Sequence, residues 1–305
     1  MMNLDFYSLF ELQQVFDTEE KCVKHLEKLR WGDKIISPFD SSSKVYVCKG
    51  NKYRCKNTGK YFNVRTNTLF DNSKIELRKW FCAIWLVISH KKGISSYQLA
   101  RDISVTQKTA WFMLQRIRKC FNILDDDSKL TGIVECDETF VGGKNKNRHF
   151  DKKVKNSQGR SFKDKTPVLG LLQRGGEVRA YVVPDTSVKS ITPVILQVVD
   201  KCATLYTDEW HGYNVVKTLY NHDFVDHSRK QYANGTVYTN TIEGFWSILK
   251  RGIIGIYHFV SKKHLQMYVD EFVFRYNTRK FSERDRFKQF LSNFEHRLTY
   301  KELTL

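Results

Sequence analysis

The chain has 305 residues, of which 41% are hydrophobic and 14% aromatic, so it can build a buried core and is not globally disordered. Its net charge of +18 predicts a polyanionic partner, with nucleic acid the first candidate and an anionic membrane surface the second. The longest apolar run, Trp80–Ser89, has ten residues, whereas a bilayer-spanning helix needs about 20. Met1–Asp5 lacks the start of a secretory signal, so the seven cysteines are expected to remain thiols in a reducing compartment.

The positive charge is spread along the chain. Lys and Arg outnumber Asp and Glu by 23 to 14 in residues 1–130 and by 28 to 19 in residues 131–305. A detachable basic tail would confine the surplus to one end, so the spread indicates that much of the protein faces the polyanion. At roughly 100–200 residues per domain, the length also predicts about two domains.

Residues 1–34 predict helices, because apolar residues recur there at three- and four-residue steps. Residues 35–72 predict a ribbon module of three short strands instead. Zinc often closes such modules through two Cys-x-x-Cys pairs. Here the four positions are Ser37, Asp40, Cys55 and Thr58. With three of four cysteines replaced, we expect a metal-free hairpin and assign no zinc ligand.

Residues 73–125 predict helices in the order of a helix-turn-helix. A short helix capped by Ser95, a tight turn and a longer helix opening at Thr106 fit that pattern, whose second helix enters the DNA major groove. A helical bundle without DNA-binding function shows the same pattern, but the net positive charge favours DNA binding. The expected contacts are polar residues along the second helix, where base edges and phosphates are natural partners: Gln107, Lys108 and Arg116.

Residues 130–285 predict a mixed α/β domain. Three early strands, then a helix, a strand and a helix, are the order of a ribonuclease-H-like domain, with a hairpin expected around Gly175-Gly176. The last residues, 286–305, predict a helical tail.

Three carboxylates in this domain predict a metal site. Asp137 and Asp208 each follow an apolar strand, and Glu243 lies on a helix. The neighbouring Glu138 and Glu209 leave the choice within each pair open, and strand alternation favours Asp137 and Asp208. A single Asp after a strand is often only a turn residue. Three carboxylates on rigid elements, however, suit Mg²⁺, and a pair of ions about 4 Å apart supports phosphodiester transfer.

Basic residues flank this predicted site. Lys250 is seven residues from Glu243, on the same helix face, where it can bind a DNA phosphate. Arg251 adjoins it. Residues 144–165 hold nine Lys and Arg against two Asp, and we weigh a DNA-tracking segment equally with a solvated loop. Its predicted DNA contacts are Lys144, Lys146 and Arg148.

Three stretches of the sequence resemble the catalytic blocks of DDE transposases. They are CDETFVGGK at 136–144, TDEWHGY at 207–213 and TNTIEGFWSILKR at 239–251. The resemblance is to the ISXO-like bacterial insertion-sequence group related to the eukaryotic Merlin transposons. It continues through 255–261 and 271–277, and covers about residues 30–280 in all.

This resemblance implies a ribonuclease-H-like catalytic domain preceded by a degenerate zinc ribbon and a helix-turn-helix. It implies binding of transposon terminal inverted repeats, followed by DNA cleavage and strand transfer with two Mg²⁺ or Mn²⁺ ions. Carried over residue by residue, it makes Asp137, Asp208 and Glu243 the metal ligands and Lys250 an accessory catalytic residue. Family members commonly carry ribbon zinc, so the replaced cysteines are a departure that makes zinc unlikely.

The partners implied are double-stranded DNA, as element ends and as target, and a second copy of the chain in a homodimer or larger complex. No membrane partner is expected, and the protein is expected inside the cell with DNA, in the nucleus if the host is eukaryotic. The main alternative is a domesticated, catalytically inactive DNA-binding protein on a transposase scaffold; a structure-selective nuclease is another. The intact carboxylate trio favours the transposase, because function is decided at the site and not by the fold.

Overall fold

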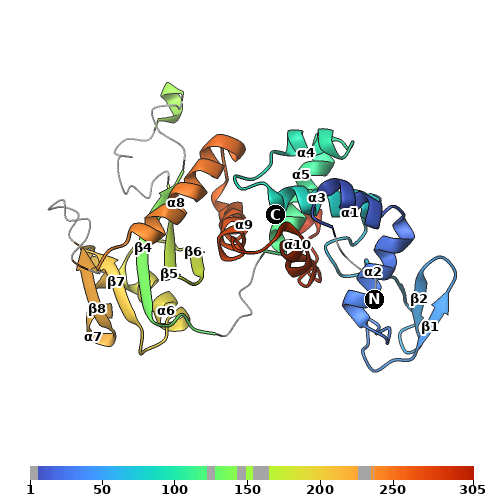
Figure 1. The fold of residues 1–305 in the computed structure, drawn as a ribbon, viewed down its shortest axis with the longest axis horizontal. Coiled ribbons are helices and arrows are strands. Elements are labelled where there is room, and N and C mark those ends of the chain that lie inside the picture. The colour runs from blue at the N-terminus through green and yellow to red at the C-terminus, as the bar shows by residue number, and fades with distance from the viewer. Residues whose placement is uncertain (1–5, 122–127, 143–148, 154–164, 226–234, 236) are drawn as a thin grey trace. The chain divides into compact units, whose positions relative to one another are not determined.

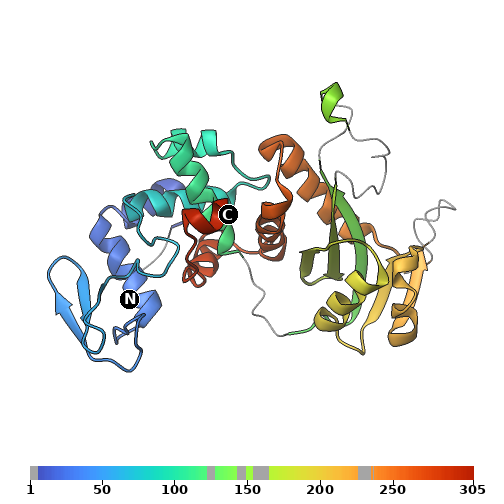
Figure 2. The same cartoon turned by 180° about the vertical axis from the view of Figure 1, so that it is seen from behind.

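A computed structural model describes residues 6–121, 128–142, 149–153, 165–225, 235 and 237–305. The chain divides into two compact units (Figures 1 and 2). Unit 1 comprises residues 1–122 and 280–305, and unit 2 comprises residues 123–279. The segment 286–305, expected as a tail, is therefore part of unit 1.

Unit 1 is built mainly from helices around an aromatic core. Phe6, Phe81 and Phe287 meet edge to face, with ring centroids 5.6 Å apart for both the Phe6–Phe287 and Phe81–Phe287 pairs. These contacts join the start of the chain to its end, and each ring is at most 1% exposed. The α-helices of unit 1 before residue 90 and after residue 280 are α1 Leu9–Val15, α2 Glu19–Trp31, α3 Leu77–Ser89, α10 Glu283–Leu291 and α11 Tyr300–Thr304.

The ribbon region of unit 1 forms a three-stranded antiparallel sheet in the order β1-β2-β3. Gly50 and Asn51 join the first two strands with φ of 71° and 55°, the left-handed conformations that a tight hairpin turn needs. The strands are β1 Val45–Cys48, β2 Lys52–Cys55 and β3 Tyr61–Phe62.

Two helices of unit 1 follow one another through a tight turn: α4 Ser96–Asp102 and α5 Gln107–Lys119. The side chain of Ser95 accepts a hydrogen bond from Gln98 N at 3.1 Å, so Ser95 caps α4 as predicted. Thr106 caps α5 through Thr109 N at 3.2 Å. These caps fix where both helices begin.

Unit 2 contains a five-stranded mixed sheet in the order β6-β5-β4-β7-β8. The pairs β4–β5 and β5–β6 are antiparallel, and the pairs β4–β7 and β7–β8 are parallel. The predicted hairpin is present as β5 and β6, and the first strand runs four residues beyond Asp137, where we expected it to end. The strands are β4 Ile133–Val141, β5 Thr166–Gln173, β6 Val178–Val182, β7 Thr204–Asp208 and β8 Asn221–Val225.

Helices cover both faces of this sheet (Figures 1 and 2). One hydrophobic cluster joins α6 Val188–Val198 and α7 Val216–Leu219 to one face, and another joins α8 Asn240–Gly252 and α9 Leu265–Asn277 to the other. Side chains alternate between these clusters along each strand, so residues two apart on β4 face the same helix. None of the helices in the described ranges is long and apolar enough to cross a membrane.

Candidate active site

Two of the three predicted carboxylates meet on neighbouring parallel strands. In the β4–β7 register Glu135 lies beside Tyr206, and Asp137 and Asp208 each follow two residues later on the same face. One carboxylate oxygen from each of Asp137, Glu138 and Asp208 lies within 4.8 Å of the other two. The structure therefore groups Asp137 with Asp208, and adds Glu138, the residue that strand alternation had led us to set aside.

Glu243 lies in the first turn of α8, on the helix that covers this face of the sheet. Its charge contributes to the raised pKa of Asp137, so it is within electrostatic range of the cluster. It is exposed, and within the described part of the chain it is not a member of the close carboxylate group. Lys250 and Arg251 occupy the last turn of the same helix and are exposed.

Like charges crowd the cluster. Burial, and then the carboxylate of Asp208, raise the pKa of Asp137 to about 7. The Trp246 indole opposes this rise by donating a hydrogen bond from Nε1 to Asp137 Oδ2 at 2.9 Å. Asp208 is 5% exposed and accepts a bond from Trp210 N at 3.0 Å. Like charges this close make it unfavourable for all of these carboxylates to be ionised at once.

The donor set fits Mg²⁺ or Mn²⁺. Carboxylate oxygens are the ligands that these hard cations prefer, and a bound cation would offset the repulsion among Asp137, Glu138 and Asp208. The adjacent thiol does not join them. Cys136 is fully buried on the opposite face, where its Sγ donates to Tyr213 Oη at 3.5 Å and burial raises its pKa.

A glycine makes room for the tryptophan that holds Asp137. Gly170 on β5 pairs directly with Asp137 on β4. A Cβ at Gly170 would lie 2.5 Å from Trp246 Cζ2 and 2.9 Å from Ile242 Cδ1, closer than packed atoms approach. We did not predict a role for Gly170 or Trp246, although Trp246 stands one helical turn from Glu243 in sequence.

Glu135 is a third acidic residue on β4 that sequence reasoning missed. It is fully buried, and its Oε2 accepts hydrogen bonds from the backbone N–H groups of Thr241 and Ile242 at 3.0 Å each. Asn240 is the first residue of this helix, and the carboxylate that accepts from the next two backbone N–H groups comes from β4. Only the folded sheet brings these residues together, since Glu135 and Thr241 are 106 positions apart.

The four ribbon positions compared with Cys-x-x-Cys pairs hold one thiol, that of Cys55. Burial alone would raise the pKa of Cys55, but hydrogen bonds from Ser37, Ser43 and Thr58 outweigh it and lower the pKa to about 6. Asp40 accepts a hydrogen bond from Asn57 Nδ2 at 2.8 Å. One thiol among hydroxyls and a carboxylate lacks the sulfur and nitrogen ligands of structural zinc, so these residues do not fit that metal.

The predicted DNA contacts of α5 differ in position. Lys108 is exposed, and Gln107 Nε2 donates to Ser96 Oγ on α4 at 2.8 Å. Arg116 is buried and does not reach the surface, so the structure corrects its assignment as a DNA contact. Its guanidinium donates to three backbone carbonyls, those of Leu69, Asp71 and Leu298. The predicted contacts Lys144, Lys146 and Arg148 lie outside the described residues.

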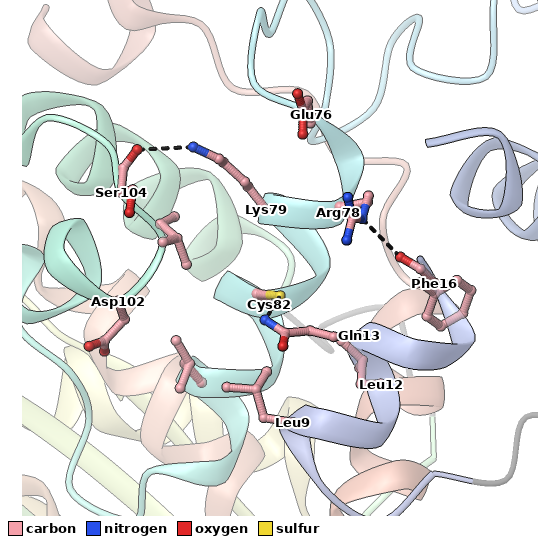
Figure 3. A pocket seen from close by; sticks show the side chains of 12 residues that line it. Leu9, Leu12, Gln13, Phe16, Glu76, Arg78, Lys79, Cys82, Asp102 and Ser104 are labelled. Atoms are coloured by element: carbon pink, nitrogen blue, oxygen red, sulfur yellow. Dashed lines mark hydrogen bonds between the residues drawn. The ribbon is translucent and has the colours of Figure 1, made fainter. Parts of the chain in front are cut away.

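A pocket in unit 1 lies between α1, α3 and the turn after α4 (Figure 3). Gln13, on this pocket, donates to Cys82 Sγ at 3.6 Å, and Lys79 donates to Ser104 O at 3.0 Å. Arg78 donates to Phe16 O at 3.2 Å. We assign it no ligand.

The chain is similar to proteins of transposable elements. Residues 129–277 match the model of the ISXO2-like transposase domain. An uncharacterized protein in transposable element ISH50 of Halobacterium salinarum is 28% identical over 276 residues, 86% of this chain and 92% of that protein. An uncharacterized transposase-like protein of Haemophilus influenzae is 28% identical over 102 residues, 33% of this chain and 81% of that one. Over residues 129–277 the chain is therefore similar to ISXO2-like transposases, and the relation to Merlin stays a prediction.

Similar solved structures include a pre-cleavage Mos1 transpososome and a Mos1 strand transfer complex. The first is 12% identical and covers 95% of this chain and 98% of its own, with a TM-score of 0.23. The second is 11% identical and covers 95% and 97%, with a TM-score of 0.25. Scores this low carry no argument about this chain.

Proposed function

We propose that this protein is a DNA transposase that binds the terminal inverted repeats of its element and carries out metal-dependent cleavage and strand transfer. The observation that carries the proposal is the pairing of Asp137 with Asp208 on adjacent parallel strands, beneath the helix that bears Glu243. These residues lie in the segment that matches a transposase domain. The five-stranded mixed sheet, in which three early strands are followed by a helix and a further strand, supports the proposed ribonuclease-H-like fold.

The chemistry follows from the side chains present. Asp137 and Asp208 supply oxygen ligands from rigid strands, and Glu243 supplies one from α8. Trp246 holds Asp137 Oδ2 in place. When bound there, Mg²⁺ or Mn²⁺ would supply Lewis-acid stabilisation of the charge that develops on the phosphate oxygens. Lys250, seven residues beyond Glu243, is placed to bind a neighbouring phosphate.

Two displacements at phosphorus complete the reaction. Water attacks the phosphodiester at the element end, the bond to the 3′ oxygen breaks, and that oxygen leaves as a 3′-hydroxyl after taking up a proton. The freed 3′-hydroxyl then attacks a target phosphodiester, so one P–O bond forms as another breaks. No external oxidant, reductant or nucleotide is needed.

DNA recognition is assigned to α4 and α5 acting as a helix-turn-helix. Lys108 is exposed at the start of α5, and Gln107 is held beside it by Ser96. The spread surplus of positive charge supports contact with both element ends and target. Because two ends must be held together, we propose a homodimer or larger complex on DNA.

The test is cleavage of a labelled terminal repeat with Mg²⁺. Asp137→Asn and Asp208→Asn should each abolish cleavage and joining while leaving repeat binding intact, because each removes a metal ligand. Glu177→Gln, which changes an exposed carboxylate on the β5–β6 turn, is the matched control and should retain activity. Full strand transfer by either aspartate variant would overturn the assignment of the site.

The same assay separates the alternatives. A domesticated DNA-binding protein on this scaffold would bind the repeat and never nick it. A structure-selective nuclease would nick it without joining the product to a target. Cleavage followed by joining distinguishes the transposase from both.

A further inference from the structure

Glu135 is a buried carboxylate that the proposed reaction does not use. It lies on β4 two residues before Asp137, with no exposed surface. Burying a charge is costly unless it is paired and hydrogen-bonded. The contacts that satisfy Glu135 therefore indicate what the residue is for.

Both oxygens of Glu135 accept two hydrogen bonds each. Oε1 accepts from Arg174 Nε at 2.7 Å and from Thr241 Oγ1 at 2.9 Å. Oε2 accepts from the backbone N–H groups of Thr241 and Ile242 at 3.0 Å each. The first N–H groups of a helix have no partner within it. The side chain of the N-cap residue, Thr239, accepts none of them, so Glu135 caps α8 from β4 instead.

Arg174 extends this contact to the remaining elements of the site. Its Nη2 donates to Tyr238 O at 2.7 Å, and its guanidinium lies 3.5 Å from the centroid of the Tyr238 ring. It also lies 4.9 Å from the ring centroid of Tyr206 on β7. The Glu135–Arg174 pair thus contacts β7, the start of α8 and Tyr238, which lies two residues before that helix.

The contacted residues stand in a regular relation to the proposed metal ligands. Glu135 precedes Asp137 by two residues, Tyr206 precedes Asp208 by two, and Thr241 precedes Glu243 by two. On each of the three elements, the residue that belongs to or contacts the Glu135–Arg174 pair therefore lies two residues before the proposed metal ligand in the sequence.

A second attachment fixes the other side of Glu243. Trp246 donates to Asp137 at 2.9 Å, so α8 is bonded to β4 both at Thr241 and Ile242 and again at Trp246. Glu243 lies between these two points on the helix. With both fixed, its backbone has little freedom to shift along or away from the strand.

We propose that Glu135, held by Arg174, is a positioning residue that fixes the start of α8 on β4 and so places Glu243 beside Asp137 and Asp208. This rests on the proposed function, because it assigns the pair a part in assembling that metal site. Stability alone is a weak reason to keep such a pair, since well-packed apolar residues are often as stabilising as a buried ion pair.

The experiment measures Mn²⁺ binding to the full chain without DNA, by the loss of the free Mn²⁺ signal in electron paramagnetic resonance. Glu135→Gln should weaken Mn²⁺ binding by about tenfold or more, as loss of residues that orient metal ligands commonly does. Glu177→Gln should leave the affinity unchanged. A thermal melt of each variant reports whether the fold persists.

A double-mutant cycle shows whether Glu135 acts through Glu243. Glu243→Gln should weaken Mn²⁺ binding, and adding Glu135→Gln should weaken it no further, because the positioned ligand is already absent. An equal additional loss in the double variant would overturn the proposal. Unchanged Mn²⁺ affinity in a folded Glu135→Gln protein would overturn it too, since a purely structural pair alters the melt alone.

A second variant covers the case in which Glu135→Gln does not fold. Thr241→Val removes only the hydroxyl bond to Glu135 and keeps the ion pair. It should weaken Mn²⁺ binding by less than tenfold, and an unchanged affinity would count against positioning. Asp137→Asn and Asp208→Asn separate the two claims: if neither weakens Mn²⁺ binding, the metal site itself is wrong, whereas if only the Glu135 and Thr241 variants have no effect, the positioning claim alone fails.

Discussion

Glu138 and Glu243 are the two candidates for the third carboxylate of the site, beside Asp137 and Asp208. Glu138 lies within 4.8 Å of Asp137 and Asp208, whereas Glu243 stands on the covering helix. We predict that Glu243→Gln abolishes terminal-repeat cleavage and that Glu138→Gln keeps most of it, because the proposed function makes Glu243 the third metal ligand. Single-turnover cleavage rates of both variants check this. The reverse result would make Glu138 the third ligand.

Gly170 is the residue on which the Asp137–Trp246 bond depends sterically. Gly170→Ala should destabilise unit 2 by about 1–3 kcal/mol, the usual cost of overpacking a core, and should displace Trp246 from Asp137. Gly244→Ala is the matched control, because a Cβ at Gly244 on α8 meets no atom within 4 Å. Denaturant unfolding followed by tryptophan fluorescence compares the two. Equal stability of both variants would contradict the packing argument.

His25 gives unit 1 a pH-dependent stability. Burial, and then the charge of Lys288, lower the pKa of His25 from 6.5 to about 4, and its ring packs 5.2 Å from that of Phe16. The unfolded chain takes up a proton near 6.5 while the folded protein does not. The contribution of neutral His25 to the stability of unit 1 is therefore complete above about pH 6.5 and is lost as the pH falls toward 4.

The variant His25→Phe should remove this dependence while keeping an aromatic ring. The free energy of unfolding of the wild type, relative to the variant, should fall between pH 7 and pH 4.5. Urea denaturation at several pH values measures it. A constant difference across that range would show that His25 does not titrate as described.

At the scale of elements, local sequence signals predicted what depends on neighbours in the chain. Ser95 and Thr106 cap α4 and α5 because their side chains reach N–H groups three residues on, and the glycine-containing turn between β5 and β6 marked their hairpin. The pattern could not give contacts between distant segments. The Glu135 cap of α8 and the burial of Arg116 both depend on residues far away in sequence.

Two basic residues on α5 show that sequence position alone does not predict which side chains are exposed. Lys108 is exposed, whereas Arg116 is 6% exposed and donates to three carbonyls. Arg116→Met should destabilise unit 1 by about 2–4 kcal/mol, because it leaves buried acceptors unpaired. Lys108→Ala should change stability by less than about 0.5 kcal/mol and weaken DNA binding. Thermal melts and gel-shift titrations check both, and a folded Arg116→Met protein with weakened DNA affinity would restore Arg116 as a contact.

At the scale of the whole molecule, the chain order does not follow the compact units. Residues 280–305 return to the unit that contains the N-terminus, where Phe287 packs against Phe6 and Arg116 donates to Leu298 O. A tail assigned from sequence order alone misses this, because helical periodicity shows that a segment has an apolar face but not which core receives it. Removal of residues 280–305 is therefore a loss of core and not of an appendage.

The surplus charge of the whole chain yields the last prediction. Each DNA phosphate neutralised by Lys or Arg releases counterions. The logarithm of the affinity therefore falls linearly with the logarithm of the salt concentration, with a slope proportional to the number of phosphate contacts. If roughly 6–10 phosphates are contacted, affinity for a terminal repeat should fall by about 10³–10⁵ between 50 and 200 mM salt. Lys250→Ala should reduce the steepness of the plot of log affinity against log salt concentration by about 1 if Lys250 binds one phosphate. Circular dichroism at each salt concentration confirms that the fold persists. A flat dependence would mean that the charge of +18 does not face DNA.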